Sequence, residues 1–373
     1  MYQGLFANGT GFSPRRFFEL DYVMLTALLL LAVLSGVALY SAGGQDAGLV
    51  ARQGIRFGIG FGLLLLLAQV SVATYRKWSP WLYLVGTLLL VLVLFAGDIS
   101  KGAQRWLDLW VVRFQPSELL KLAVPMMLCW LFAADSNIVR GWKFVLALVL
   151  LAVPVVTVAL QPDLGTAALI AMSGLFVIFL AGLSWLWIVL ALISVLLLTP
   201  VVWHLLFDYQ KQRLITFFNP ESDPLGTGYH IIQSKIAIGS GGVWGKGWLQ
   251  GSQSQLDFIP ERATDFVFAV LSEEFGFVGI CVLILLYLLV VFRGLMISFQ
   301  ATDEFGRLLA GAFILTFFLS FFVNISMVSG LLPVVGVPLP LISYGGTSAV
   351  TLLCSFGVLM AIARYRPMMR ENP

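Results

Sequence analysis

The stretch WLWIVLALISVLLLTPVVWHLLF occupies residues 185–207 and contains no Asp, Glu, Lys or Arg. A helix needs about 20 mainly apolar residues to cross the hydrocarbon core of a bilayer, and this stretch meets that length. Its residues are too evenly apolar for the alternating strands of an outer-membrane barrel. The stretch therefore predicts a membrane-spanning helix.

The rest of the chain repeats this pattern. Of its 373 residues, 60% are apolar and 11% charged, and the mean hydropathy is +0.95, far from the balance of a soluble domain. We expect an all-α, polytopic membrane protein, a single integral membrane unit over residues 1–373. Ten spans are predicted, at Tyr22–Tyr40, Phe57–Val72, Trp81–Ala96, Leu119–Ala134, Phe144–Leu160, Leu164–Leu183, Trp185–Phe207, Phe266–Phe292, Leu308–Leu332 and Val350–Ala363.

An even number of spans puts both termini on one side of the membrane. More Lys and Arg residues fall on that side than near the short loops of the other. The positive-inside rule therefore predicts cytoplasmic termini, and the first apolar run is long enough to remain as an anchor.

Several classes of function are disfavoured. Cys129, Cys281 and Cys354 lie within apolar runs, so we expect neither a disulfide nor structural zinc. His204 and His230 lack Cys or His neighbours at ligand spacing. The net charge of +3 is too small and dispersed to predict nucleic-acid binding.

The segment from about residue 208 to 264, between the seventh and eighth spans, is expected to be a long extracytoplasmic loop. Within it, Gly228–Ile238 has the mixed polarity of a short helix at the membrane interface. Gly239–Gly247 looks like a phosphate loop but lacks the first Gly and the final Ser or Thr. A loop of this length usually has a function, although a solvated tether is the alternative.

The run Pro260-Glu261-Arg262-Ala263-Thr264-Asp265-Phe266 ends this loop at the start of the eighth span. A carboxylate at the entrance of a spanning helix is costly to desolvate, which favours a functional role for Asp265. The alternative is that Asp265 caps the helix. Local sequence favours neither interpretation.

Further polar residues flank spans on the same predicted side. Glu118 and Lys121 are three residues apart, hence on one helical face, and Lys121 is suited to contact a phosphate. For Asp163 and Asn324, helix capping and hydrogen bonding between helices are the favoured interpretations. Together these residues predict a polar cavity, open to the outer face, for a lipid-linked anionic substrate.

These residues lie in blocks that resemble the SEDS family of bacterial membrane proteins (shape, elongation, division and sporulation), which includes RodA and FtsW. The resemblance covers essentially the whole chain and is closest to the RodA, or elongation, members, because Arg262 follows Glu261 where we expect Ala in the division members. The resembling blocks are residues 101–107, 114–118, 161–166, 223–226, 228–239, 260–269 and 338–346.

The resemblance implies a peptidoglycan glycosyltransferase that polymerises lipid II at the outer face of the bacterial cytoplasmic membrane. It assigns Asp265 as the essential carboxylate. It also implies a class B penicillin-binding protein as partner, within the elongation complex that includes MreB, MreC and MreD.

The leaving pyrophosphate needs a positive charge. Lys121 is the first candidate, with Arg262, Arg105, Arg52 or a divalent cation (Mg or Mn) as others. Arg52, Arg56 and Arg105 could instead only anchor lipid headgroups at the interface. Glu118 is expected to orient Lys121 or to help hold the metal, and Glu261 to pair with Arg262. Trp106 and Ser343 complete the predicted substrate-binding residues.

Two other functions stay open. A lipid II flippase needs a similar cavity but no base at position 265. A non-catalytic scaffold for the cross-linking enzyme would tolerate Asp265→Asn.

Overall fold

The computed structural model describes residues 20–364 except for 101–102, 109–112, 134–141, 184, 206–207, 220, 222, 224–225, 257 and 260. Parts of the resembling blocks, including Lys101, Gly102, Pro224 and Pro260, therefore lie outside the described residues. A helix lies over each of the ten predicted runs: α1 Tyr22–Ala42, α2 Ala47–Leu67, α3 Val72–Ala96, α4 Pro116–Phe132, α5 Trp142–Leu160, α6 Leu164–Leu180, α7 Trp185–Leu205, α11 Val267–Gln300, α12 Glu304–Val328 and α13 Thr347–Arg364.

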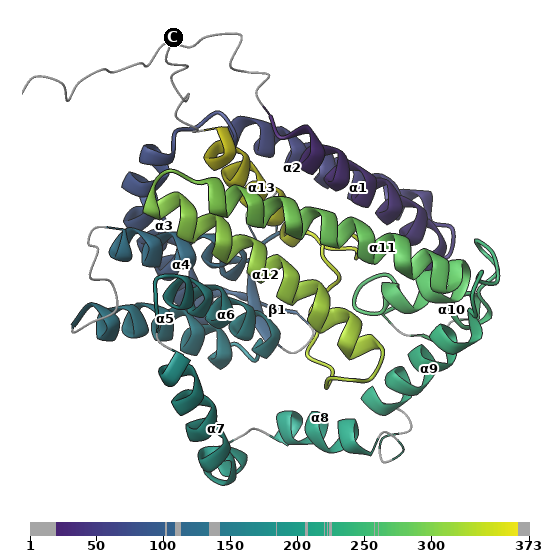
Figure 1. Ribbon diagram of the computed structural model, residues 1–373. Coiled ribbons are helices and arrows are strands. Elements are labelled where there is room, and N and C mark those ends of the chain that lie inside the picture. The colour runs from purple at the N-terminus through teal and green to yellow at the C-terminus, as the bar shows by residue number, and fades with distance from the viewer. Residues whose placement is uncertain are drawn as a thin grey trace, which may run out of the picture.

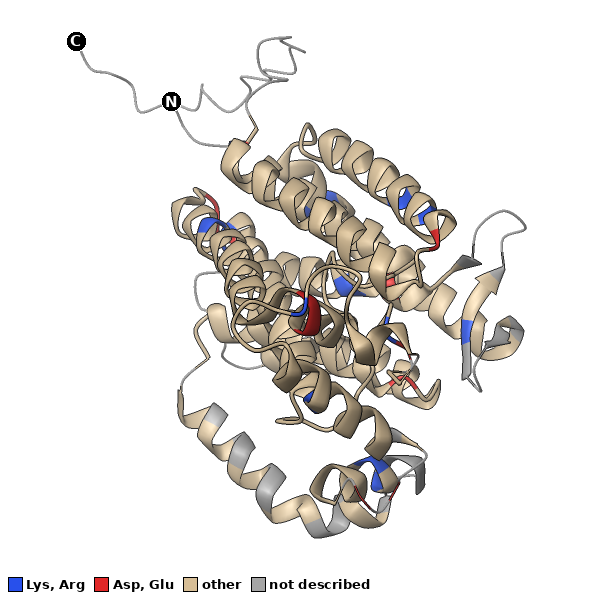
Figure 2. Cartoon of the chain, turned by 90° about the vertical axis from the view of Figure 1, so that its right-hand side faces the viewer, with Lys and Arg blue, Asp and Glu red and all other residues tan. Residues whose placement is uncertain are grey.

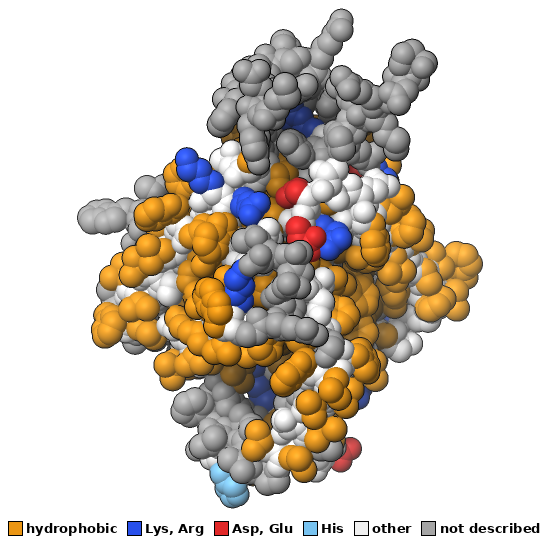
Figure 3. Space-filling view, turned by 60° about the vertical axis from the view of Figure 1, so that its left-hand side comes forward, with side chains coloured by type: hydrophobic (Ala, Val, Ile, Leu, Met, Phe, Trp, Pro, Cys, Tyr) orange, Lys and Arg blue, Asp and Glu red, His pale blue; other side chains and the backbone are white. Residues whose placement is uncertain are grey.

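Seven of these helices, within the described residues, are long and apolar enough to cross a membrane: α1, α2, α3, α5, α11, α12 and α13. Helix α6 is apolar but shorter. Figure 2 shows mostly uncharged helices, and apolar side chains cover much of the face in Figure 3. Large apolar side chains that are exposed include Leu88, Phe95, Val149, Leu186 and Leu285. The chain is thus a multi-pass membrane protein.

The helices confirm the prediction of an all-α polytopic protein, to which the structure adds three short antiparallel strands. These are β1 Asp98–Ser100, β2 Ala103–Asp108 and β3 Arg113–Phe114, in the order β1-β2-β3. They lie between α3 and α4, and Trp106 of β2 pairs with Asp98 of β1. These strands are too short to give a periodic signal in a chain dominated by apolar runs.

Helix α2 begins ten residues before the predicted span, at Ala47 rather than Phe57. Its start is fixed by Asp46, whose side chain accepts a hydrogen bond from the Gly48 amide. Arg52 and Arg56 therefore lie on the first turns of a helix rather than in a loop. Helix α3 likewise begins earlier, at Val72 instead of Trp81, capped by Ser71.

Contacts between helix ends fix which termini share a side. Asp21, which caps α1, pairs with Arg293 near the end of α11, with 2.7 Å between Oδ2 and Nε. Arg364, at the end of α13, donates to Gln69, just after α2, at 2.6 Å. Since α1 and α2 run in opposite directions, the start of α1 and the end of α13 lie at the same end of the bundle.

The centre of the bundle is apolar and tightly packed. Helices α11 and α12 lie side by side across it, as Figure 1 shows, and Tyr287 of α11 stacks on Phe321 of α12. Helix α13 packs against α2 where Gly60 faces Leu353, so closely that a Cβ on Gly60 would lie 2.5 Å from that side chain. Small residues permit such close approach of membrane helices.

The segment predicted to be a long extracytoplasmic loop, from about residue 208 to 264, contains helices. It contains α8 Asp208–Phe218, α9 Thr227–Ser240 and α10 Ser252–Gln255, and α7 and α8 extend away from the bundle in Figure 1. The predicted helix at 228–238 is confirmed as α9, and its position at the membrane interface stays a prediction. It is tied to the end of α12, because the Ser234 hydroxyl donates to the Val328 carbonyl at 2.8 Å.

Helix α11 is broken at Gly276, where φ is 63° and ψ is −160°. The segment Gly242–Gly247 lies in this break and makes four backbone hydrogen bonds of 2.9–3.1 Å with residues 273–278. Backbone groups freed by a helix break in a membrane protein need such partners. The glycine-rich stretch that superficially resembled a phosphate loop thus completes the hydrogen bonding of α11.

Candidate active site

Asp265 lies in a turn, residues 261–266, that leads into α11; we call it the Asp265 turn. Phe266 occupies the N-cap position of α11, and Asp265 is the residue before it. Asp265 is therefore not the N-cap residue of this helix. Its carboxylate instead lies beside Gly336, where an added Cβ would be 3.6 Å from Oδ2.

Three successive carbonyls of the Asp265 turn are held by hydrogen bonds. The Tyr344 amide donates to Ala263 at 2.8 Å. The Ser343 hydroxyl donates to Thr264, and the Asn324 amide group donates to Asp265 at 2.9 Å. Residues 343 and 344 belong to the connection between α12 and α13, residues 329–346, which we call the α12–α13 loop. The backbone that carries Asp265 is thus held by α12 and by this loop.

Ser343, predicted to contact substrate, has its hydroxyl engaged by the protein. Besides donating to Thr264, it accepts a hydrogen bond from the Leu339 amide at 2.8 Å. Its carbonyl accepts from Gln53 of α2 at 3.4 Å. Ser343 is buried, and these contacts indicate a role in shaping the α12–α13 loop.

Glu118 and Lys121 face one another on α4, as predicted. Lys121 Nζ lies 2.7 Å from Glu118 Oε1, and both side chains are largely buried. They line a pocket that contains about 760 Å³ of empty space, part of it open to the outside. Its other walls come from α12, from α13, from Leu169 of α6 and from residues 337–341 and 343 of the α12–α13 loop. The same loop therefore borders the Lys121 pocket and holds the Asp265 turn.

Arg105 is placed by the strands, next to Trp106 on β2. Its guanidinium donates to the carbonyls of Gln161 (3.2 Å) and Pro162, and Nη1 lies 3.6 Å from Asp163. Asp163 also caps α6, accepting from the Thr166 amide at 3.2 Å, so the capping prediction for Asp163 is confirmed. Arg105 of β2 therefore links the strands to the turn before α6 through hydrogen bonds and an ion pair.

Arg52 and Arg56 lie one turn apart on α2 and flank Tyr344. The Arg56 guanidinium lies 4.5 Å from the centre of the Tyr344 ring, and Arg52 pairs with Asp46 at 3.3 Å. Partial burial raises the pKa of the Tyr344 hydroxyl, but hydrogen bonds and the charges of the two arginines outweigh it, so the pKa is lowered. The positive charge thus lies beside Tyr344, the residue whose amide holds the Ala263 carbonyl.

Arg262 and Glu261 begin the Asp265 turn. Arg262 donates to the Ser254 carbonyl of α10, and its guanidinium also lies near Gly44, between α1 and α2. Glu261 has a positive φ of 52° and accepts from the Thr264 hydroxyl at 2.9 Å. The predicted pairing of Glu261 with Arg262 stays a prediction.

Sequence reasoning missed Glu273 and Glu274, which are buried in the first part of α11. Glu273 binds Lys246 at 2.7 Å and accepts from the amides of Gln253 and Ser254 at 2.9 and 3.2 Å. Glu274 accepts from Ser41 of α1. Glu273 thereby positions the segment that holds Arg262. Two adjacent carboxylates inside an apolar run were the available signal.

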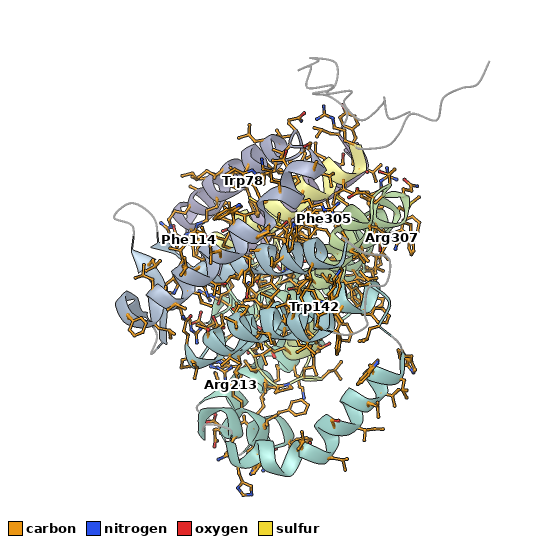
Figure 4. All side chains as sticks on the ribbon, turned by 90° about the vertical axis from the view of Figure 1, so that its left-hand side faces the viewer. Trp78, Phe114, Trp142, Arg213, Phe305 and Arg307 are labelled. Atoms are coloured by element: carbon orange, nitrogen blue, oxygen red, sulfur yellow. The ribbon has the colours of Figure 1, made fainter. Side chains whose placement is uncertain are left out.

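Helix α9 contributes His230, whose ring lies 5.8 Å from that of Phe266, the residue after Asp265. Burial lowers the pKa of His230, although the charges of Glu261 and Asp223 oppose this effect. Helix α8 contributes Arg213, which donates to Val334 of the α12–α13 loop at 3.1 Å. Figure 4 shows Arg213 at the opposite side of the molecule from Phe305 and Arg307, which begin α12. Helices α8 and α9 therefore contact the α12–α13 loop and the Asp265 turn, respectively.

No group of three or more His, Cys, Asp or Glu residues that could hold a metal ion occurs among the described residues. Mg²⁺ can bind through one or two carboxylates together with substrate phosphates, so the predicted divalent cation stays a prediction.

Comparison with known proteins identifies the family. The family model described as "Cell cycle protein", for FtsW, RodA and SpoVE, matches residues 16–368. The chain belongs to the SEDS family.

Curated relatives extend over nearly the full chain. Peptidoglycan glycosyltransferase MrdB of Escherichia coli K12 is 52% identical over 95% of this chain and 96% of its own. Stage V sporulation protein E of Bacillus subtilis is 34% identical, over 92% and 97%.

Two solved structures share the fold. A chain of a peptidoglycan synthase complex that coordinates polymerization and crosslinking has a TM-score of 0.83 and 32% identity, over 94% of this chain and 99% of its own. The rod shape determining protein RodA of Thermus thermophilus has a TM-score of 0.72 and 29% identity over the same shares.

Proposed function

We propose that this chain is a peptidoglycan glycosyltransferase that polymerises lipid II into β-1,4 glycan strands during cell elongation. The observation that carries the proposal is the placement of Asp265 in a turn held by the loop that also lines the Lys121 pocket. The 52% identity to a peptidoglycan glycosyltransferase over 95% of the chain agrees with it.

Asp265 acts as the general base. The 4-hydroxyl of a GlcNAc acceptor loses its proton to the carboxylate as its oxygen attacks the anomeric carbon of a MurNAc donor. The bond from that carbon to undecaprenyl pyrophosphate breaks, and the α-linked donor becomes a β-linked product by one inverting displacement. A positioned base contributes about 10²–10⁴-fold to such a reaction.

Lys121 and Arg262 stabilise the negative charge of the leaving pyrophosphate. Lys121 is favoured because it lies in a pocket and its charge is held in place by Glu118. Arg262 is part of the Asp265 turn, and its side chain is held by the Ser254 carbonyl. Preorganised charges of this kind need little rearrangement during the reaction.

The other predicted residues have supporting roles. Arg105 and Trp106 shape the outward strands, Arg52 adds positive charge beside Tyr344, and Ser343 and Glu261 support the Asp265 turn. A divalent cation (Mg or Mn) would bring further positive charge to the substrate phosphates.

The chain crosses the bacterial cytoplasmic membrane ten times, with both termini cytoplasmic and Asp265 facing the periplasm. The start of α1 and the end of α13 lie at the same end of the bundle, which supports an even number of spans. The excess of basic residues on that side supports its cytoplasmic placement.

A class B penicillin-binding protein is the proposed partner, which cross-links the new strands within the elongation complex with MreB, MreC and MreD. The similar chain from a peptidoglycan synthase complex supports such a partner.

The test uses purified protein, labelled lipid II and the partner, with an inhibitor of classical glycosyltransferases present. Glycan strands in this reaction support the proposal. No strands, with labelled lipid II crossing the bilayer of proteoliposomes, would favour the flippase alternative. Neither activity from folded, partner-bound protein would favour the scaffold.

A further inference from the structure

We propose that Asn324 is a positioning residue, which joins the backbone of Asp265 to the wall of the Lys121 pocket. This inference rests on the proposed function, because it assigns Asn324 a role in placing the general base. Asn324 lies on α12, fully buried and 59 residues from Asp265 in sequence.

The side-chain amide of Asn324 uses both of its N–H groups. Nδ2 donates to the Asp265 carbonyl at 2.9 Å and to the Val337 carbonyl at 2.7 Å. Its Oδ1 has no hydrogen-bond partner among the described residues, so the two contacts through Nδ2 hold the amide. One rigid planar group therefore sets the separation of two backbone segments that are not helical.

Both segments belong to the site. Asp265 carries the proposed base, and Val337 lines the pocket that contains Glu118 and Lys121. The neighbouring Gly336 faces the Asp265 carboxylate. A displacement of Val337 therefore changes the position of Asp265 through the Asn324 amide.

The other contacts to the Asp265 turn do not replace this one. Tyr344 and Ser343 hold the carbonyls of Ala263 and Thr264, which precede Asp265. Without Asn324 those two contacts remain, but the peptide group that follows the Asp265 side chain loses its donor. The turn is then expected to keep its fold while the carboxylate loses its fixed direction.

Two variants of similar size test this role. Asn324→Leu removes both donors, and Asn324→Asp replaces them with a carboxylate that faces two carbonyl oxygens. A buried carbonyl without a donor is unfavourable, so the Asp265 and Val337 segments should separate in both variants. The control is Ser326→Ala, which is also buried and lies two residues further along α12.

Steady-state polymerisation of lipid II by the full chain with its partner is the first readout. Because a small misplacement of a reacting group can cost about 10²-fold, we expect kcat of both Asn324 variants to fall about 10²-fold. KM for lipid II should change less than kcat, because Glu118 and Lys121 lie on α4 and keep their positions. An unchanged kcat, or a loss expressed only in KM, would overturn the inference.

Hydrogen exchange of the purified protein is the second readout, and it needs no activity. In both Asn324 variants, peptides covering residues 261–268 and 335–344 should exchange faster, whereas those covering α1 and α13 and those of Ser326→Ala should match the wild type. Unchanged exchange at the two segments would overturn the inference. If hydrogen exchange becomes faster at these two segments in the Asn324 variants but the wild type makes no glycan, the link through Asn324 stands and the proposed function fails.

Discussion

Lys121 Nζ lies 2.7 Å from Glu118 Oε1 across one turn of α4, inside the pocket bordered by the α12–α13 loop. A largely buried ion pair contributes little net stability compared with apolar residues of the same size, because both ions lose water. The ion pair lies in a pocket next to the Asp265 turn, which indicates that the lysine charge has a role other than stabilising the fold.

We expect Lys121→Met to lower the catalytic efficiency of lipid II polymerisation about 10–100-fold, because a charge-assisted contact to the pyrophosphate is lost. Lys121→Arg should keep part of the activity. The matched control is Arg307→Met, which removes an Arg307–Glu304 pair of the same spacing at the start of α12, 2.6 Å apart and more exposed. Equal kcat/KM for Lys121→Met and wild type would contradict the assignment.

Gly276 should be intolerant of a side chain. Gly276→Ala places a Cβ 2.3 Å from the Gly245 amide nitrogen, at a φ of +63°. We expect a loss of roughly 1–3 kcal/mol in the free energy of unfolding from the backbone conformation alone. Gly58→Ala on α2 is the control, because its Cβ meets no atom within 4 Å and an alanine favours the helix.

Thermal unfolding of the two glycine variants in one detergent gives the comparison. The structural interpretation requires that the melting temperature of Gly276→Ala is lower than that of the wild type and that the melting temperature of Gly58→Ala is not. If both variants melt at the same temperature as the wild type, the positive φ of Gly276 and its close contact with Gly245 are contradicted.

His230 should make stability depend on pH. Burial lowers its pKa in the folded protein, so the unfolded chain binds a proton first as the pH falls. The stability contribution of neutral His230 is full above about pH 6.5, its unfolded pKa, and is lost as the pH falls towards the lowered folded pKa.

The melting temperature of the wild type should therefore drop more steeply below about pH 6.5 than that of His230→Gln. His204→Gln is the control, because His204 is exposed and lies on α7. If the melting temperature of His230→Gln falls with pH as steeply as that of the wild type, His230 is not the source of the pH dependence.

The sequence was sufficient to predict features that depend on local composition. The apolar runs predicted a helix over each span, and the three-residue spacing predicted the contact between Glu118 and Lys121. Bounds were wrong where polar residues lie within a helix: α2 includes Arg52 and Arg56, which hydropathy assigned to a loop.

Features that depend on distant residues could not be predicted in this way. The Asn324 contact joins residues 59 positions apart. The sequence favoured a hydrogen bond between helices for Asn324, whereas its acceptors are carbonyls of the Asp265 turn and of the α12–α13 loop. The break at Gly276 depends on the backbone of Gly242–Gly247, and nothing in the local sequence distinguishes Gly276 from Gly279 or Gly294. The three strands depend on pairing between neighbouring short segments.

The role of Asp265 is tested most directly by glycan synthesis from labelled lipid II, comparing Asp265→Asn with the wild type in the partner-bound state. Asp303→Asn is the matched control, because Asp303 caps α12 at the other end of the bundle and Asn caps a helix equally well. We predict long glycan strands from the wild type and from Asp303→Asn, and none from Asp265→Asn. Strands from Asp265→Asn at the wild-type rate would contradict the assignment of Asp265 as the general base.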